Sequence, residues 1–196
     1  MYDVKGNLHE VLGSLPAGVR LVAISKFHPN EYIEEAYAEG QRIFGESHEQ
    51  ELAKKVASLP EDIEWHFIGH LQTNKVKYIA PYISMIESVD SLKLLKEIEK
   101  QAAKHNRVVK VLLELHLAEE DTKSGLSLDA CRELLEAGEW REMKHVQICG
   151  IMMMASNTDD EQQIAQEFDE AAQFFDEIKA CLLYTSDAAD DRISVD

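Results

Sequence analysis

The segment Val22-Ala-Ile-Ser-Lys26 closes a short apolar run that begins at Val19. The run shows no alternation of polar and apolar residues, as expected of a strand buried on both faces of a parallel sheet. The next segment, Glu31 to Glu39, is predicted to be a helix, and Asn30 can cap it. The start of the chain therefore predicts a strand followed by a helix, with Lys26 at the carboxyl end of the strand.

The same order of strand and helix recurs along the chain. Strands are predicted at 19–25, 42–45, 65–68, 83–89, 108–117 and 146–152, and helices at 2–15, 31–39, 47–59, 73–80, 92–105, 127–137 and 160–180. Strict alternation implies right-handed βαβ units and a parallel sheet. Six such units fit either an open doubly wound sheet or six-eighths of a (β/α)8 barrel, and periodicity does not separate the two. No glycine-rich fingerprint follows the first strand, which weakens a dinucleotide-binding interpretation.

The composition indicates one globular domain. A chain of 196 residues can bury a core, and 45% hydrophobic with 29% charged residues is ordinary for a soluble protein. No apolar run approaches the ~20 residues that a membrane helix needs, and the N-terminus does not resemble a signal peptide. The cysteines Cys131, Cys149 and Cys181 have no metal-like spacing. These features favour a cytoplasmic protein with reduced thiols and no metal site.

The formal net charge of −17 bears on the partners. It argues against nonspecific nucleic-acid binding, because the phosphate backbone would be repelled. It does not exclude an anionic cofactor, because a local pocket can be positive on an acidic protein. We therefore expect neither nucleic acid nor a membrane as a partner.

Residues 181–196 do not continue the pattern. They show no helical period, no strand alternation and no clear cap, and they resemble the translated read-through of a sequencing-library adapter. We expect residues 1–180 to form the domain and residues 181–196 to be foreign to it. A natural disordered tail is the alternative.

Lys26 is the sharpest candidate for chemistry. A lysine amine attacks an aldehyde only when it is unprotonated, and an apolar surrounding favours the neutral amine. At the end of a barrel strand the amine would face the ligand mouth. By position alone, a lysine that extends to solvent from a strand end is the commoner explanation.

A second segment carries the most specific signal: Trp65-His-Phe-Ile-Gly-His-Leu-Gln-Thr-Asn-Lys75, with Ile79 following. It is an apolar strand that ends in a tight polar turn and the start of a helix. Gly69 allows a close backbone approach, and Asn74 can cap the next helix. Together with the run that ends at Lys26, this segment resembles the signature of the pyridoxal phosphate homeostasis (YggS/PROSC) family.

Other segments support the resemblance, which covers nearly all of residues 1–180. Phe44-Gly-Glu-Ser-His-Glu-Gln-Glu51 matches the second-strand motif of the family in part, with Ser47 where the family often has asparagine. Lys123-Ser-Gly125 resembles the loop after the fifth strand. Gly150-Ile-Met-Met-Met-Ala155 resembles the sixth strand.

The resemblance implies a (β/α)8 barrel of the TIM type that is incomplete here, with about six βα units present and the last two missing. It implies that pyridoxal 5'-phosphate (PLP) forms an internal aldimine with Lys26, and it places Ser47 and His66 at the cofactor site. From the residues alone, Ser47 is equally well a helix cap, and a mid-strand histidine such as His66 is more often a hydrogen-bonded core residue.

The resemblance also implies what this chain lacks. The Ser/Gly-rich phosphate loop after strand seven and the Arg-Ile-Gly turn after strand eight have no counterpart, and barrels commonly hold phosphate with these loops. An unclosed barrel also leaves two open sheet edges. We therefore expect this chain to be unstable and to bind PLP poorly, and a completed version to bind it well.

Three functions stay open. The resemblance implies a monomeric PLP carrier for cofactor homeostasis, with apo PLP enzymes as candidate recipients. A fold-type-III PLP enzyme such as an amino-acid racemase would need an acid/base opposite Lys26, from His66 or His48. A barrel enzyme without PLP could use Lys26 for an aldolase-type Schiff base. No all-β stretch of the kind that racemases add is present, which favours binding over catalysis.

Overall fold

In the computed structural model of the chain, residues 3–117 and 124–180 are described. They contain one sheet of six parallel strands in the order β1-β2-β3-β4-β5-β6. The strands are β1 (Ala23–Ile24), β2 (Ile43–Glu46), β3 (Glu64–Phe67), β4 (Met85–Val89), β5 (Val109–Leu115) and β6 (Val146–Met153). Sequential order is that of a barrel, whereas a doubly wound sheet reverses its order at a switch point. The barrel-type prediction is confirmed, and the doubly wound alternative is wrong.

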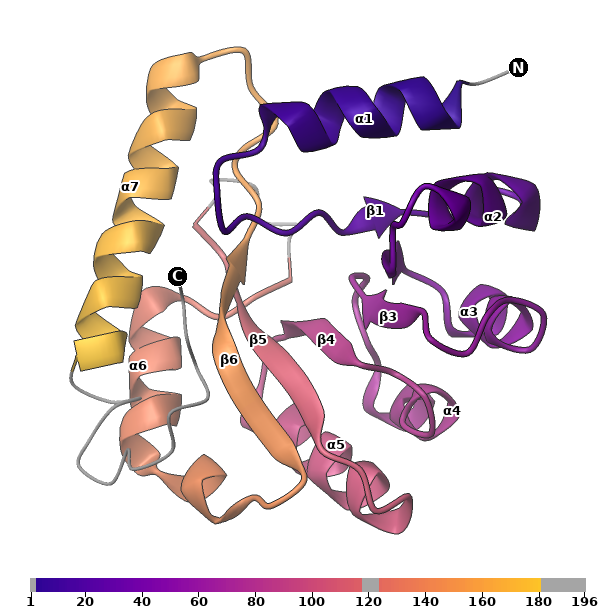
Figure 1. Cartoon of the computed structure of the whole chain (residues 1–196). Helices are drawn as coiled ribbons and strands as arrows, with labels where there is room; N and C mark the ends of the chain where they lie inside the picture. Colours follow the sequence, from indigo (N-terminus) through magenta and orange to yellow (C-terminus); the bar gives the residue numbers. More distant parts are fainter. Residues whose placement is uncertain (1–2, 118–123, 181–196) are drawn as a thin grey trace.

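Helices connect the strands and follow one another around the outside of the sheet (Figure 1). They are α1 (Val4–Ser14), α2 (Asn30–Ala38), α3 (Glu49–Val56), α4 (Val76–Ile79), α5 (Leu92–Lys104), α6 (Leu128–Ala137) and α7 (Glu161–Ile178), with short 3₁₀ turns at η1 (Thr73–Lys75) and η2 (Glu139–Glu142). No helix of the described residues has both the length and the apolar character required to cross a membrane. The predicted tail at 181–196 and the predicted loop residue Lys123 lie outside the described residues.

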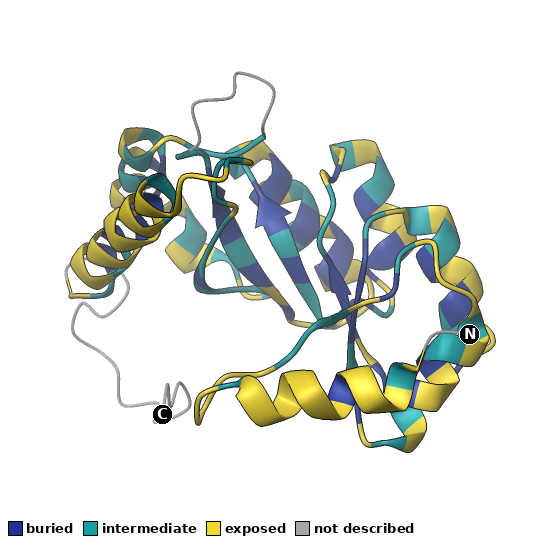
Figure 2. Ribbon diagram, turned by 90° about the horizontal axis from the view of Figure 1, so that it is seen from above, coloured by how far each residue is buried: buried dark blue, intermediate teal, exposed yellow. Residues whose placement is uncertain are grey.

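The main core lies between the sheet and the helices. Alternate strand side chains point to this outer face and are almost completely buried, as Figure 2 shows for the strand interiors. They include Phe44, Trp65, Phe67, Ile86, Val111 and Leu113. Burying a large apolar side chain contributes about 1.5–3 kcal/mol relative to its exposed state, so this face supplies most of the driving force for folding.

The opposite, inner face of the sheet is more polar. A hollow on this face is lined by charged and polar side chains as well as by Met85 and Leu112; the polar members include Glu64, His66, Glu87 and Lys110. The predicted burial of the first strand on both faces is therefore wrong for its inner side, where Ile24 remains 48% exposed; Val108, just before β5, is 56% exposed on the same face.

Two local predictions need correction. Strand β1 is shorter than the predicted 19–25, because it pairs with β2 alone in the described sheet and Val19 stays exposed. Asn30 does not cap α2. Pro29 is the residue before the helix, and the Asn30 amide instead donates a hydrogen bond to Ser58 at 2.8 Å.

Candidate cofactor site at the carboxyl end of the sheet

Lys26 follows β1 directly at the carboxyl edge of the sheet. A Cβ atom at Gly45 would meet Ile24 Cδ1 at 3.0 Å and Val22 Cγ1 at 3.2 Å, so Val22 and Ile24 lie over Gly45 on the inner face. Residues two apart in a strand point to the same face, and Lys26 is two residues after Ile24. Its side chain is therefore on the inner face as well. Lys26 is half-buried, and within residues 3–117 and 124–180 it has no hydrogen bond or ion pair. Its amine therefore stands unpaired at the rim of the inner face.

A tight turn closes immediately after Lys26. The His28 N–H donates to the Ser25 carbonyl at 3.0 Å, so Lys26 and Phe27 are the central residues of a β-turn. Phe27 has a φ of 65°, in the left-handed region that a bulky side chain rarely adopts. The residue is 75% exposed, and its ring lies 5.4 Å from the His48 ring, measured between centroids. The backbone around Lys26 is therefore held in an unfavourable conformation by its surroundings.

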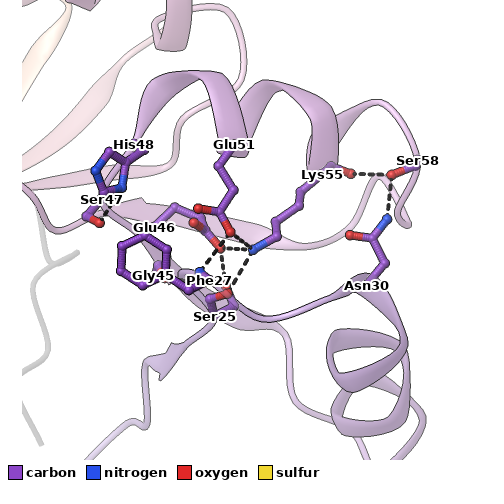
Figure 3. Close-up of polar contacts among 10 residues, drawn as sticks. All are labelled: Ser25, Phe27, Asn30, Gly45, Glu46, Ser47, His48, Glu51, Lys55 and Ser58. Carbon is purple, nitrogen blue, oxygen red and sulfur yellow. Dashed lines mark hydrogen bonds and ion pairs between the residues drawn. The ribbon is translucent and has the colours of Figure 1, made fainter.

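A buried ionic cluster lies beneath this turn, formed by Glu46 of β2 with Glu51 and Lys55 of α3 (Figure 3). Lys55 Nζ donates to Glu46 Oε1 at 2.6 Å, to Glu51 Oε1 at 2.6 Å and to the Ser25 carbonyl at 2.8 Å. The Ser25 hydroxyl donates to Glu46 Oε1 at 2.6 Å. All three ammonium donors of Lys55 therefore have acceptors, as a buried charge requires.

Glu51 extends the cluster to the other side of Lys26. Its Oε1 accepts the Phe27 N–H at 2.8 Å. Burial alone would raise the pKa of the Glu51 carboxyl, but the hydrogen bonds from Lys55 and from the Phe27 N–H outweigh this effect and lower the pKa below its usual value. Glu51 is therefore ionised at neutral pH.

Ser47 lies at the same rim, at the end of the neighbouring strand β2. A Cβ atom at Gly69 would fall 2.7 Å from the Ser47 carbonyl oxygen, so the ends of β2 and β3 approach as closely as only glycine allows. The prediction that Ser47 caps the following helix is wrong, because His48 occupies that position and the Ser47 hydroxyl contacts His48 Nδ1 at 3.0 Å. Asn74 likewise caps no helix, since it lies inside η1.

His66 lies one row deeper than Lys26 and Ser47. It pairs in register with Gly45, which in turn pairs with Ile24. Its Nδ1 is 2.6 Å from Glu87 Oε1, and its side chain is only 5% exposed. The structure thus brings Lys26 and Ser47 to adjacent strand ends, while His66 is a hydrogen-bonded residue of the inner face.

Sequence reasoning missed Lys55. Glu46 and Glu51 belong to the quoted second-strand motif without an assigned role, and Lys55 was not singled out within the predicted 47–59 helix. One signal was available: Lys55 lies three residues after the buried Leu52 and four after Glu51, which places a lysine on the apolar side of a helix beside an acidic partner.

Comparison with known proteins shows the family of the chain. A family model described as the alanine racemase N-terminal domain matches residues 3–189. The pyridoxal phosphate homeostasis protein of Aquifex aeolicus is 37% identical over 161 residues, which cover 82% of this chain and 70% of that protein. The chain belongs to the pyridoxal phosphate homeostasis family. The Pasteurella multocida member is 31% identical and is matched over 76% of its length.

Solved structures of this family have the same fold. PipY of Synechococcus elongatus without PLP superposes with a TM-score of 0.86 at 33% identity, covering 91% of this chain and 83% of PipY. PipY with PLP bound gives a TM-score of 0.82 at 32% identity. An alanine racemase of Clostridium difficile shares the fold alone, with a TM-score of 0.70 at 12% identity over 49% of that chain.

Proposed function

We propose that this pyridoxal phosphate homeostasis family member holds PLP through Lys26 and acts as a PLP carrier. The observation that carries the proposal is the unpaired Lys26 amine at the carboxyl rim of a barrel-type sheet, in a turn supported by a buried cluster. The curated relatives named for PLP homeostasis and the PLP-bound PipY structure support the same ligand.

The residues present fit the aldehyde end of PLP. The neutral Lys26 amine would bond to the aldehyde carbon, and the aldehyde oxygen would leave as water, which is the ordinary formation of a Schiff base. Bound PLP would supply an electron-withdrawing ring conjugated to that bond. Ser47 can offer a hydroxyl from the adjacent strand end, whereas His66 supports the inner face from one row below.

The phosphate end has less support from the described residues. Barrels commonly hold phosphate with the loops after strands seven and eight, and the described sheet ends at β6. We therefore expect the covalent bond to Lys26 to contribute most of the retention of PLP by this chain.

A racemase function is not favoured by the site. His66 is hydrogen-bonded to Glu87 one row below the rim, and His48 is exposed and contacts Phe27. Neither histidine is therefore placed as a proton donor facing Lys26. Exchange of the α-deuterium of a labelled amino acid into solvent would be the sign of such an activity, and we expect none.

Borohydride trapping tests the proposed function. The chain is incubated with PLP, reduced, digested and mapped by mass spectrometry. Because we expect this chain to bind PLP poorly, the yield of trapped adduct should be low, but the adduct that forms should lie predominantly on the peptide with Lys26. It should be lost in Lys26→Arg and retained in Lys54→Arg, which changes an exposed lysine of α3. A folded protein with scattered labelling and no preference for Lys26 would refute the proposal.

We further infer a monomeric, cytoplasmic carrier that can pass PLP to apo enzymes, a role supported by the names of the relatives. Light scattering at increasing protein concentration tests the monomer. Recovery of activity by an apo PLP enzyme mixed with the loaded chain, compared with an equal amount of unbound PLP, tests the transfer.

A further inference from the structure

We propose that Glu51 and Lys55 of α3 are positioning residues that hold the two peptide groups flanking Lys26, so that the Lys26 amine is presented to an aldehyde ligand. This inference rests on the proposed function, because it assigns the support of the same lysine. We assign both a supporting role because their polar atoms are occupied by the turn and by each other: they extend from α3 toward the Ser25–Phe27 turn (Figure 3), and Lys55 is buried.

The contacts select the peptide groups on both sides of Lys26. The carbonyl of Ser25 belongs to the peptide bond before Lys26, and it accepts Lys55 Nζ at 2.8 Å. The N–H of Phe27 belongs to the peptide bond after Lys26, and it donates to Glu51 at 2.8 Å. Glu51 and Lys55 are four residues apart on one helix and bond to each other at 2.6 Å. The Glu51–Lys55 pair therefore hydrogen-bonds to the backbone on both sides of Lys26.

The turn needs these two hydrogen bonds because the backbone of Phe27 has a left-handed conformation. A bulky residue at a φ of 65° has an unfavourable backbone conformation that persists only where other contacts enforce it. The exposed Phe27 ring adds little packing of its own, with 75% of the residue in solvent. The charge-assisted hydrogen bond that the Phe27 N–H donates to Glu51 is the contact that holds Phe27 in the turn.

The same cluster keeps carboxylates away from the Lys26 amine. Glu46 and Glu51 both reach the turn region, and an ammonium paired with either of them would be a poor nucleophile. Lys55 occupies Oε1 of each carboxylate at 2.6 Å, and Glu46 is fully buried. Lys26 has no ionic partner in the part of the chain that the structure describes. Lys55 is therefore the cation that pairs with both carboxylates, and the Lys26 amine is left without an acidic partner.

The test uses Glu51→Ala, with Glu49→Ala as its matched control. Both substitutions remove an ion-paired glutamate from the first turn of α3, but Glu49 pairs with Lys75 and does not contact the Lys26 turn. In Glu51→Ala the buried Lys55–Glu46 pair stays charge-balanced, so the fold is expected to persist, which circular dichroism and the melting temperature check.

The measured quantity is the rate of pyridoxyl labelling at Lys26, by timed borohydride trapping with PLP as the probe. We expect labelling to slow by roughly tenfold or more in Glu51→Ala, because misplacement by about 1 Å can cost on the order of a hundredfold in rate. We expect Glu49→Ala to label at the wild-type rate. Equal rates in wild type and folded Glu51→Ala would overturn the inference, while Lys26 labelling in both would leave the proposed function standing.

A rescue experiment separates positioning from general stabilisation. Glycine adopts a positive φ without steric cost, so adding Phe27→Gly to Glu51→Ala should restore most of the labelling rate. Because Phe27→Gly also removes a strained conformation from the folded state, the melting temperature is measured beside the labelling rate, and positioning predicts a slow rate in Glu51→Ala at temperatures where that variant is fully folded. Rescue of labelling at Lys26 supports the inference, and failure of the rescue with the double variant folded contradicts it. If even the wild-type chain shows no preference for Lys26, the proposed function fails first.

Discussion

The two faces of the sheet differ in what their side chains do. On the outer face, side chains such as Phe67 and Leu113 are almost wholly buried against the helices. The inner face carries Glu64, His66, Glu87 and Lys110 around a hollow, with its apolar residues only partly covered. The outer face therefore supplies most of the stability of the fold. The inner face carries polar groups, and Lys26 lies at its carboxyl edge.

The ionic cluster of Glu46, Glu51 and Lys55 is the exception on the outer face. It lies at the carboxyl end of β1 and β2, where the apolar packing gives way to buried charges. A buried ion pair is a poor source of stability, since desolvation offsets much of the attraction. The cluster contacts the backbone on both sides of Lys26, so it links the outer face to the rim where the proposed site lies.

The largest effect is expected from breaking the outer-face cluster. Lys55→Met would leave the fully buried Glu46 carboxylate without its cation, at a cost of about 3–5 kcal/mol in the free energy of unfolding. Lys110→Met on the inner face removes an exposed lysine and should change that free energy by less than about 0.5 kcal/mol. Urea denaturation measures both. Similar losses for the two lysines would contradict the contrast between the faces.

The second effect compares two neighbouring leucines of β5. Leu113→Ala creates a cavity in the outer core, where Leu113 is fully buried, and should lower the free energy of unfolding by about 2–5 kcal/mol. Leu112 lines the inner hollow and is only partly buried, so Leu112→Ala should cost about 1 kcal/mol. The denaturation midpoints of the two variants, measured under the same conditions, test this difference. A Leu112 variant as damaged as the Leu113 variant would mean that the inner face is packed as tightly as the outer one.

A smaller effect is expected for the inner-face pair of His66 and Glu87. Glu87→Gln keeps the size of the side chain but removes the charge from a hydrogen bond of 2.6 Å, which should cost about 1–2 kcal/mol. A double-mutant cycle with His66→Gln isolates the pair. Trapping at Lys26 should stay near the wild-type rate in Glu87→Gln, because the pair lies one row below the rim. A loss of trapping as large as in Glu51→Ala would instead show that His66 belongs to the cofactor site.

The smallest effect is a pH dependence. The pKa of Glu51 in the folded protein is lowered from its ordinary value of 4.5. A carboxyl with a lowered folded-state pKa contributes stability that is fully present above its unfolded pKa and is lost as the pH falls through the folded pKa. The difference in unfolding free energy between wild type and Glu51→Ala should therefore be constant at neutral pH and shrink below about pH 4.5. Denaturation curves measured from neutral to acidic pH test this, and a difference that grows on acidification would reverse the assigned sign.

Much of the fold was predictable because strand and helix periodicity are local. The predicted 92–105 and 127–137 helices and the predicted 146–152 strand match α5, α6 and β6 within about two residues. The caps were less predictable, since Pro29 and His48 precede their helices where Asn30 and Ser47 were expected. A side chain that can cap a helix also finds partners elsewhere in the fold, as Asn30 does at Ser58.

The site was predictable only in part. Lys26 stood out because it ends an apolar run, and Ser47 followed from the family motif. The role of Lys55 depends on three segments. The residue after β1 supplies the Ser25 carbonyl, which is 30 residues away from Lys55 in sequence, β2 supplies Glu46, and α3 supplies Glu51 and Lys55 itself. A helical lysine is exposed by default, and nothing within α3 alone states that two strand ends will cover it.

The sequence by itself determined the alternation of strands and helices, the apolar face that each one buries, and the lysine at the end of the first strand, because these follow from local periodicity and from residue chemistry. Only the tertiary structure decided that the strands pair in sequential order, that His66 lies below the rim with Glu87, and that Lys55 supports the backbone of Lys26. These features arise from contacts between segments far apart in the chain, where the position of each side chain is set by partners that local patterns do not identify.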